Sequence, residues 1–143
     1  MTEVSFHFNV PDRTAYTCRL LRKAIRQGAA VVVTGPAAAL ARLDRELWTF
    51  DPVEFLPHRM LRPGGPAPER RDPTRVWLLE DSGAAPHHDV LVNFGDDTPA
   101  GFESFARVIE IVSPDESDRL AARGRWKHYA ARGYAIDTHE VGE

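Results

Sequence analysis

The sequence predicts an α/β fold in three layers, with a mainly parallel central sheet flanked by helices. Three observations predict this class: apolar residues alternate over Val4–Val10, helical periods follow Asp12 and Pro36, and residues 29–34 form a short apolar run. Such a run is typical of a strand covered on both faces, as in a parallel sheet. The order strand, helix, strand, helix favours a layered sheet of Rossmann-like type.

The first four elements follow from local patterns. Alternation of apolar and polar residues predicts a first strand with one buried face. Asp12 is placed to cap a helix over about 13–27, whose apolar residues recur at spacings of three and four and which ends before Gly28. After the buried strand, Gly35-Pro36 opens a second helix over about 37–48, with leucines on one face.

The rest of the sequence predicts further strands, a short helical stretch and a final helix. The strands cover about 76–79, 90–94, 107–112 and 134–138, and the helical stretch covers 102–105. Ser113 is placed to cap the final helix, about 115–132, with Pro114 in its first turn and Gly133 after its end. We expect a single domain over 1–143, in which the proline- and glycine-rich residues 62–73 form a mobile loop.

Composition and charge restrict the function. Hydrophobic residues make up 43% of the chain and charged residues 27%, as in ordinary globular proteins. The net charge of −3 argues against a grip on nucleic acid by the whole surface. The one cysteine, Cys18, cannot form an internal disulfide, and no apolar run reaches membrane-spanning length or follows a basic start as in a signal peptide. We therefore expect a cytoplasmic protein.

Motifs for phosphate or metal binding do not match. The segment Thr34–Ala39 contains one glycine and no lysine, so it fits neither a Walker loop nor the dinucleotide fingerprint. The six histidines lack paired ligand spacing, and their one cluster, His87-His88-Asp89, falls in an expected surface loop. We predict no catalytic residue, no metal and no cofactor. A Rossmann-like nucleotide-binding enzyme that uses the Gly35-Pro36 turn is the alternative.

The final helix carries a basic stripe. Residues 119–132 contain five basic side chains and no acid, so the remainder of the chain carries a net charge of −8. At about 100° per residue, Arg119, Arg123 and Trp126 fall on one stripe. Guanidinium groups beside an indole suit a peptide that carries carboxylates and an aromatic side chain. The other interpretation places Trp126 on the core face with Tyr129, and the arginines at its edge.

A second group of aromatic residues lies between the second helix and the middle of the chain. Trp48, Phe50 and Phe55 crowd the end of that helix and the loop after it. Loops usually carry polar surface, so such a segment is either tucked into the core or forms a face for a partner. The sequence leaves both interpretations open.

These two segments together resemble the chi subunit family of bacterial DNA polymerase III. The resemblance rests on Leu43-Asp44-x-x-Leu47-Trp48 followed by Phe55-Leu56-Pro57-His58, and on Arg123-x-Arg125-Trp126-Lys127-x-Tyr129-x-x-x-Gly133-Tyr134. Order and spacing agree over nearly the whole chain, including the first strand and Asp89–Asn93. The resemblance implies one α/β domain without a nucleotide role, which agrees with the unmatched phosphate motifs.

The resemblance also implies a function. Chi subunits are non-catalytic and link the clamp-loader complex to single-stranded-DNA-binding protein, whose acidic C-terminal tail ends in phenylalanine. Carried over by position, Arg119, Arg123 and Lys127 surround the carboxylates of that tail. The pocket for the terminal phenyl ring is implied for Val112, Trp126, Tyr134 and Thr138.

The family's other face binds the psi subunit or, in some bacteria, a repair helicase. It is implied here for Trp48, Phe55, Pro57 and His58. We expect a monomer or a heterodimer that reaches DNA only through its partners. Direct binding of single-stranded DNA through residues 119–132 is a further alternative, which the overall charge disfavours.

Overall fold

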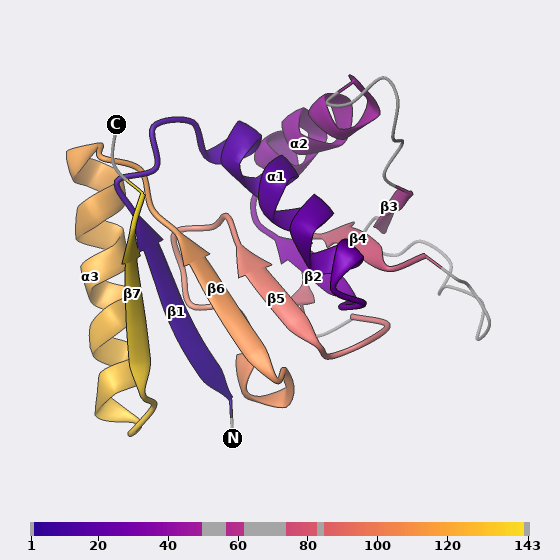
Figure 1. Ribbon diagram of the computed structural model, residues 1–143. Helices are drawn as coiled ribbons and strands as arrows, with labels where there is room; N and C mark the ends of the chain where they lie inside the picture. The colour runs from indigo at the N-terminus through magenta and orange to yellow at the C-terminus, as the bar shows by residue number, and fades with distance from the viewer. Residues whose placement is uncertain (1, 50–56, 62–73, 83–84, 142–143) are drawn as a thin grey trace.

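The computed structural model describes residues 2–49, 57–61, 74–82 and 85–141 (Figure 1). Strands and helices alternate along much of the chain. The elements in order are β1 (Glu3–Phe8), α1 (Arg13–Arg26), β2 (Val31–Thr34), α2 (Ala37–Thr49), β3 (His58–Leu61), β4 (Val76–Leu79), β5 (Val90–Asn93), the 3-10 helix η2 (Phe102–Ser104), β6 (Arg107–Ile111), α3 (Glu116–Ala131) and β7 (Ile136–Glu140).

The seven strands form one sheet in the order β3-β4-β2-β5-β6-β1-β7. Every pairing between neighbours is parallel; in the pair β1–β6, for example, Val4 lies opposite Val108. Strand β7 joins the sheet at the far side of β1, where Ile136 also pairs with Val4. The predicted α/β class with a parallel sheet is therefore confirmed.

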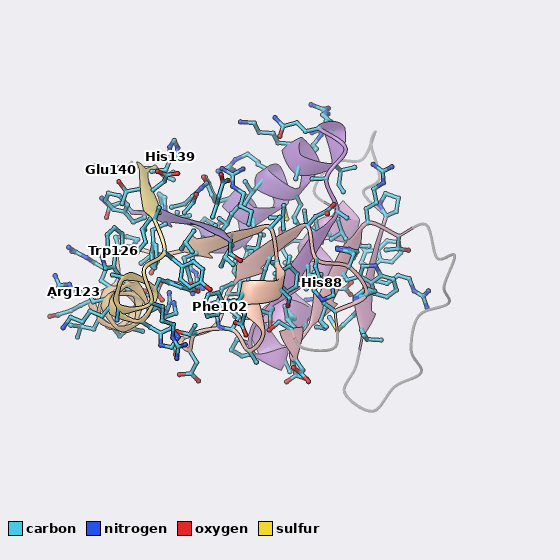
Figure 2. All side chains as sticks on the ribbon, turned by 90° about the horizontal axis from the view of Figure 1, so that it is seen from below. His88, Phe102, Arg123, Trp126, His139 and Glu140 are labelled. Carbon is cyan, nitrogen blue, oxygen red and sulfur yellow. The ribbon has the colours of Figure 1, made fainter. Side chains whose placement is uncertain are left out.

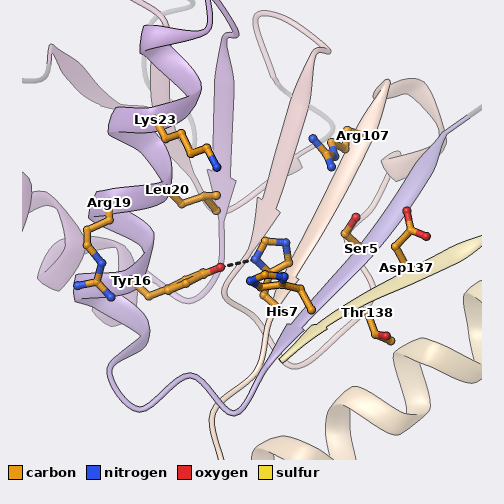
Figure 3. Close-up of a pocket in the computed structure, with 10 residues that line it drawn as sticks. Ser5, His7, Tyr16, Arg19, Leu20, Lys23, Arg107, Asp137 and Thr138 are labelled. Carbon is orange, nitrogen blue, oxygen red and sulfur yellow. Dashed lines mark hydrogen bonds between the residues drawn. The ribbon is translucent and has the colours of Figure 1, made fainter. Parts of the chain in front are cut away.

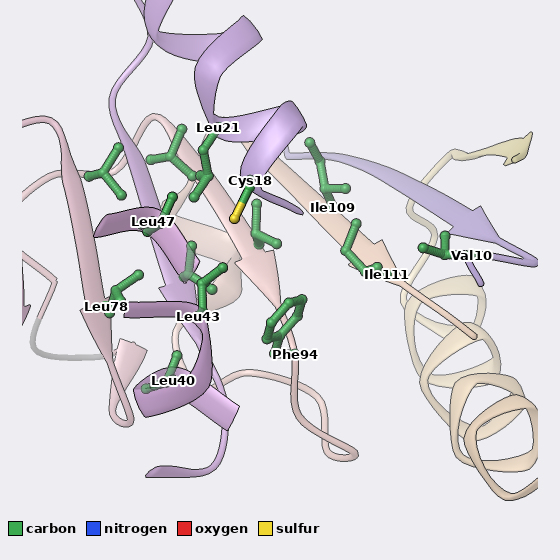
Figure 4. Close-up of a cluster of buried hydrophobic side chains, with 14 residues drawn as sticks. Val10, Cys18, Leu21, Leu40, Leu43, Leu47, Leu78, Phe94, Ile109 and Ile111 are labelled. Atoms are coloured by element: carbon green, nitrogen blue, oxygen red, sulfur yellow. The ribbon is translucent and has the colours of Figure 1, made fainter. Parts of the chain in front are cut away.

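Two hydrophobic layers cover the sheet, one on each face. Helices α1 and α2 pack on one face, and their cluster contains Cys18, Leu21 and Leu43 (Figure 4). Helix α3 and η2 cover the other face, where the cluster contains Phe6 and Tyr129. Strand β2 contributes to both clusters and is buried throughout, as its continuous apolar run predicts.

Strand β3 was missing from the sequence-based prediction. It pairs in parallel with β4, and His58 lies opposite Val76. The sequence His58–Leu61 lacks a strand signal because its burial is uneven: His58 is buried, Arg59 is exposed and Met60 is half-buried. Pairing with β4 at the sheet edge, rather than local pattern, makes this segment a strand. The loop expected over 62–73 lies outside the described residues.

The start of the final helix differs from the prediction. Asp115, not Ser113, occupies the N-cap position of α3, and its side chain makes no capping hydrogen bond. The Ser113 hydroxyl instead accepts from the Asp115 N–H, while the Ser113 N–H donates to Asp118 Oδ2 at 2.8 Å. This tight connection leaves β6 and enters the helix two residues later than a Ser113 cap would allow. The helix ends before Gly133, whose φ of 84° is of the left-handed kind that glycine tolerates.

Candidate functional site

An open pocket of about 260 Å³ lies between α3 and the β1–β7 edge of the sheet. We call it the α3 pocket. Its lining consists of Phe6, Phe8, Val112, Arg119, Ala122, Arg123, Trp126 and Thr138. Alternation along β1 directs Phe6 and Phe8 to the α3 face, and the pairing of Thr138 with Phe6 puts β7 beside them. The floor is therefore apolar, and the helix supplies the opposite wall.

Trp126 forms the boundary between this pocket and the core. Its ring lies 5.1 Å from the Phe6 ring, centroid to centroid, and the residue is 37% exposed. Tyr129, three residues later, is fully buried. Tyr129 thus belongs to the core face, whereas Trp126 lines an accessible hollow beside the core. Figure 2 shows Trp126 and Arg123 together at α3.

Arg119 and Arg123 lie one helical turn apart at the rim of the α3 pocket. Both are exposed, and neither guanidinium pairs with a carboxylate among the described residues. A guanidinium presents several N–H donors in a planar fork that matches a carboxylate. The pocket can therefore take an apolar group on its floor and a carboxylate at its rim.

Lys127 and Tyr134, which the family resemblance implied for the tail-binding site, do not line the pocket. Lys127 is exposed on α3. Tyr134 follows the helix and packs against Phe102, with ring centroids 5.3 Å apart. Tyr134 lies beyond the end of α3, where its N–H donates to the Tyr129 carbonyl at 3.2 Å, whereas Arg119 is in the first turn of the helix. The structure brings Val112, Arg119, Arg123, Trp126 and Thr138 together around one hollow.

Arg125 is the residue whose role the sequence did not reveal. It was counted with the basic segment, but it is only 3% exposed, so the exposed basic residues are Arg119, Arg123, Lys127 and Arg132. Its Nε donates to Glu110 Oε1 at 2.9 Å, and its Nη1 donates to the Asp96 carbonyl at 2.9 Å. The available signal was Glu110 itself, an acid in the middle of an apolar strand.

Glu110 is the centre of a buried polar network. Besides Arg125, its carboxylate accepts from the Tyr129 hydroxyl at 2.7 Å and from Asn93 Nδ2 at 3.0 Å. Burial raises the pKa of Glu110, and the Arg125 guanidinium opposes that rise by stabilising the charged form. Burial and the adjacent Glu110 carboxylate also raise the pKa of Tyr129. The network joins α3 to β5 and β6 from inside the core.

The second predicted face is partly described. Trp48 at the end of α2 is 59% exposed, and its ring lies 5.3 Å from that of buried His58. His58 Nε2 lies 3.0 Å from Asp44 Oδ1, which ties β3 to α2. Pro57 is exposed next to His58, whereas Phe50 and Phe55 lie outside the described residues. Trp48 therefore packs on His58, next to Pro57 in the chain, and Trp48 is a surface residue.

The Gly35-Pro36 turn has a packing role. A Cβ atom on Gly35 would lie 2.8 Å from Phe94 Cβ, so glycine is required where the ends of β2 and β5 meet. A neighbouring hollow of about 540 Å³ at the start of α1 and α3 is lined by four carboxylates, with two arginines. One of these arginines, Arg13, is already engaged with Asp118 and the Phe94 carbonyl. Such a lining repels a phosphate.

The described part of the chain holds neither a metal-binding cluster nor a membrane-spanning helix. Its histidine, cysteine and acidic side chains nowhere gather in threes suitable for a metal ion. None of its helices combines the length and the apolar character needed to span a bilayer. Cys18 lies in the core, and burial raises the pKa of its thiol to about 11.

Fold and pocket together define the class: a parallel α/β protein with a small apolar pocket at one sheet edge and two guanidinium groups at the rim of that pocket. The chain belongs to the family of the DNA polymerase III chi subunit, HolC, whose model matches residues 1–137. Membership places the protein in DNA replication, among the subunits of DNA polymerase III.

Relatives from three bacteria are similar to this chain over most of its length. The DNA polymerase III subunit chi of Pseudomonas aeruginosa is 32% identical, covering 99% of this chain and 98% of its own. The Haemophilus influenzae subunit chi is 30% identical over 87% of this chain and 85% of its own. The Escherichia coli subunit chi is 25% identical over 85% and 80%, respectively.

Proposed function

We propose that this chi-family protein is a non-catalytic adaptor of the clamp-loader complex in the cytoplasm. In this proposal it binds the acidic C-terminal tail of single-stranded-DNA-binding protein and so links that protein to the polymerase. The observation that carries the proposal is the α3 pocket, in which an apolar floor lies directly beside the exposed guanidinium groups of Arg119 and Arg123.

The chemistry of the pocket suits the end of such a tail. A phenyl ring on the floor formed by Phe6 and Trp126 would contribute about 2–3 kcal/mol through burial. A terminal carboxylate at the rim would accept charge-assisted hydrogen bonds from Arg119 and Arg123, each worth about 1.5–3 kcal/mol. Lys127, on the same exposed side of α3, would attract further carboxylates of the tail. A pocket of this size implies modest affinity, which several tails on one oligomeric partner would raise.

The face around Trp48 is proposed for a second protein partner, either psi or a repair helicase. A large indole that is more than half exposed, beside the fixed ring of His58, is the kind of aromatic anchor found at the centre of protein interfaces. This face lies at the other end of the sheet from the α3 pocket, because β3 and β7 are the two edge strands. Both partners can therefore be bound at once.

The test of the proposal is direct binding of a fluorescent acidic peptide that ends in phenylalanine. Arg123→Ala should weaken binding by roughly 10- to 150-fold, the equivalent of one lost charge-assisted bond, and rising salt should weaken binding of the wild type. Arg132→Ala is the matched control, since it removes the same charge from the exposed surface just beyond α3. Removing the terminal phenylalanine from the peptide should abolish binding. Equal binding by folded Arg123→Ala and Arg132→Ala would assign the peptide to another site.

A further inference from the structure

A second hollow, of about 480 Å³, lies on the opposite face of the β1–β7 edge. Helix α1 packs over the middle of the sheet (Figure 1), and residues 137–140 of β7 are exposed at this end; Figure 3 shows the residues that line the hollow. Cationic side chains reach the hollow from two sides: Arg19 and Lys23 from α1, and Arg107 from the start of β6. We call this the basic hollow.

The charge of the basic hollow is positive. Its lining holds Arg19, Lys23 and Arg107 against one acid, Asp137. None of the three cations pairs with a carboxylate among the described residues. The His7 Nδ1 and the Tyr16 hydroxyl, 2.5 Å apart, satisfy each other at the floor, and the Arg19 guanidinium lies over the Tyr16 ring. The N–H donors of the three cations are the groups that can bind a ligand. Carboxylates are therefore the complementary chemistry.

One strand separates the basic hollow from the α3 pocket. Thr138 of β7 is part of the lining of both. Along β7, Thr138 is directed toward α3 and Asp137 toward the basic hollow, as the alternation of a strand requires (Figure 3). Strand β7 is also the last strand of the sheet, so its outer edge is not covered by another described strand.

A short stretch of extended peptide can join the two hollows. An extended chain advances about 3.3–3.6 Å per residue, so three residues cover about 10 Å, roughly twice the spacing between neighbouring strands. If the last residue of a peptide lies in the α3 pocket, residues about four to six positions before it reach the basic hollow. Arg19, Lys23 and Arg107 then lie where upstream acids of the same peptide arrive.

We propose that the acidic residues upstream of the tail's terminal phenylalanine cross the β7 edge at Thr138 and bind in the basic hollow. This inference rests on the proposed function of the α3 pocket and assigns a second subsite to the same ligand. The α3 pocket recognises the end of the tail, and the basic hollow recognises its charge. The cations are exposed, so each contact adds a small amount to the affinity.

The experiment compares two peptides on two proteins. The short peptide has four residues and ends in phenylalanine; the long peptide adds four upstream residues that include three acids. Wild type should bind the long peptide about three- to ten-fold more tightly than the short one. Arg19→Ala/Lys23→Ala should lose that difference while binding the short peptide as wild type does. Arg107→Ala, on a different element, should reduce the difference independently.

Matched controls separate this inference from the proposal on which it rests. Arg42→Ala/Arg45→Ala removes two charges from exposed positions of α2 and should keep the full difference between peptides. A long peptide with amides in place of its acids should bind as weakly as the short one. The second subsite is overturned if Arg19→Ala/Lys23→Ala still binds the long peptide more tightly than the short one. It is also overturned if only a thymidine oligonucleotide displaces the upstream part of the long peptide from the basic hollow. Both results leave binding of the short peptide intact. Failure of wild type to bind either peptide overturns the proposed function itself.

Discussion

Replacing Arg125 with methionine should destabilise the protein by about 3–5 kcal/mol, the usual cost of leaving one buried charge without its partner. The substitution removes the bonds from Arg125 to Glu110 and to the Asp96 carbonyl, each 2.9 Å long. Glu110 has no exposed surface and would keep only the Tyr129 and Asn93 donors. The lost interactions include one buried charge-assisted pair and one hydrogen bond to the Asp96 carbonyl, which together account for this magnitude.

Urea unfolding, followed by circular dichroism, measures the effect. At about 3–4 °C per kcal/mol for a chain of this length, the same loss lowers Tm by roughly 10–20 °C. The double variant Glu110→Gln/Arg125→Met removes both charges, so it should be more stable than Arg125→Met alone. A loss below about 1 kcal/mol in Arg125→Met, or a double variant as unstable as the sum of both single variants, would refute the reasoning that this charge pair holds α3.

Two further predictions concern stability. Burial lowers the pKa of His7 to about 4, so between about pH 6.5 and pH 4 the unfolded chain binds the proton more tightly and stability falls as pH falls. Because His7 is half-buried, we expect the free energy of unfolding to fall by about 1–2 kcal/mol from pH 7 to pH 4. In parallel urea titrations, His7→Gln should not show this fall. Equal falls in the wild type and in His7→Gln would contradict the prediction. Gly35→Ala should lower the free energy of unfolding by about 1–3 kcal/mol in the same assay at pH 7, because the added Cβ would lie 2.8 Å from Phe94 Cβ. An unchanged urea midpoint would mean instead that the ends of β2 and β5 move apart at no cost.

Local patterns in the sequence predicted those elements along which burial follows one regular pattern. The run Ala29–Thr34 specifies β2 because every side chain of that strand is buried, whichever face it occupies. Strand β3 lacks such a pattern, since only His58 at its start is buried. This segment is a strand because it pairs with β4. The start of α3 was shifted for a similar reason: the Ser113 hydroxyl is used within the turn before the helix.

The candidate site was predictable as far as one helix defines it. Helical spacing places Arg119, Arg123 and Trp126 on one stripe, and the structure puts all three around the α3 pocket. The floor of that pocket comes from Phe6 and Phe8, more than a hundred residues away in the chain, and no local pattern indicates which helix covers β1. The burial of Arg125 was hidden for the same reason, because its partner Glu110 belongs to β6.

The Glu110–Arg125 pair also determines how α3 can vary. The helix has few large apolar side chains facing the sheet, with Ala122 and Tyr129 as its buried anchors, and hydrophobic contacts alone tolerate small rotations. A directional charge pair does not tolerate such rotations, because turning α3 by one residue would leave the Glu110 carboxylate in the core without its partner. The angular position of the exposed stripe is thus set from beneath the helix. Surface positions on α3 are consequently free to be exchanged, by evolution or by an engineer seeking a new peptide specificity, without disturbing the helix that presents them.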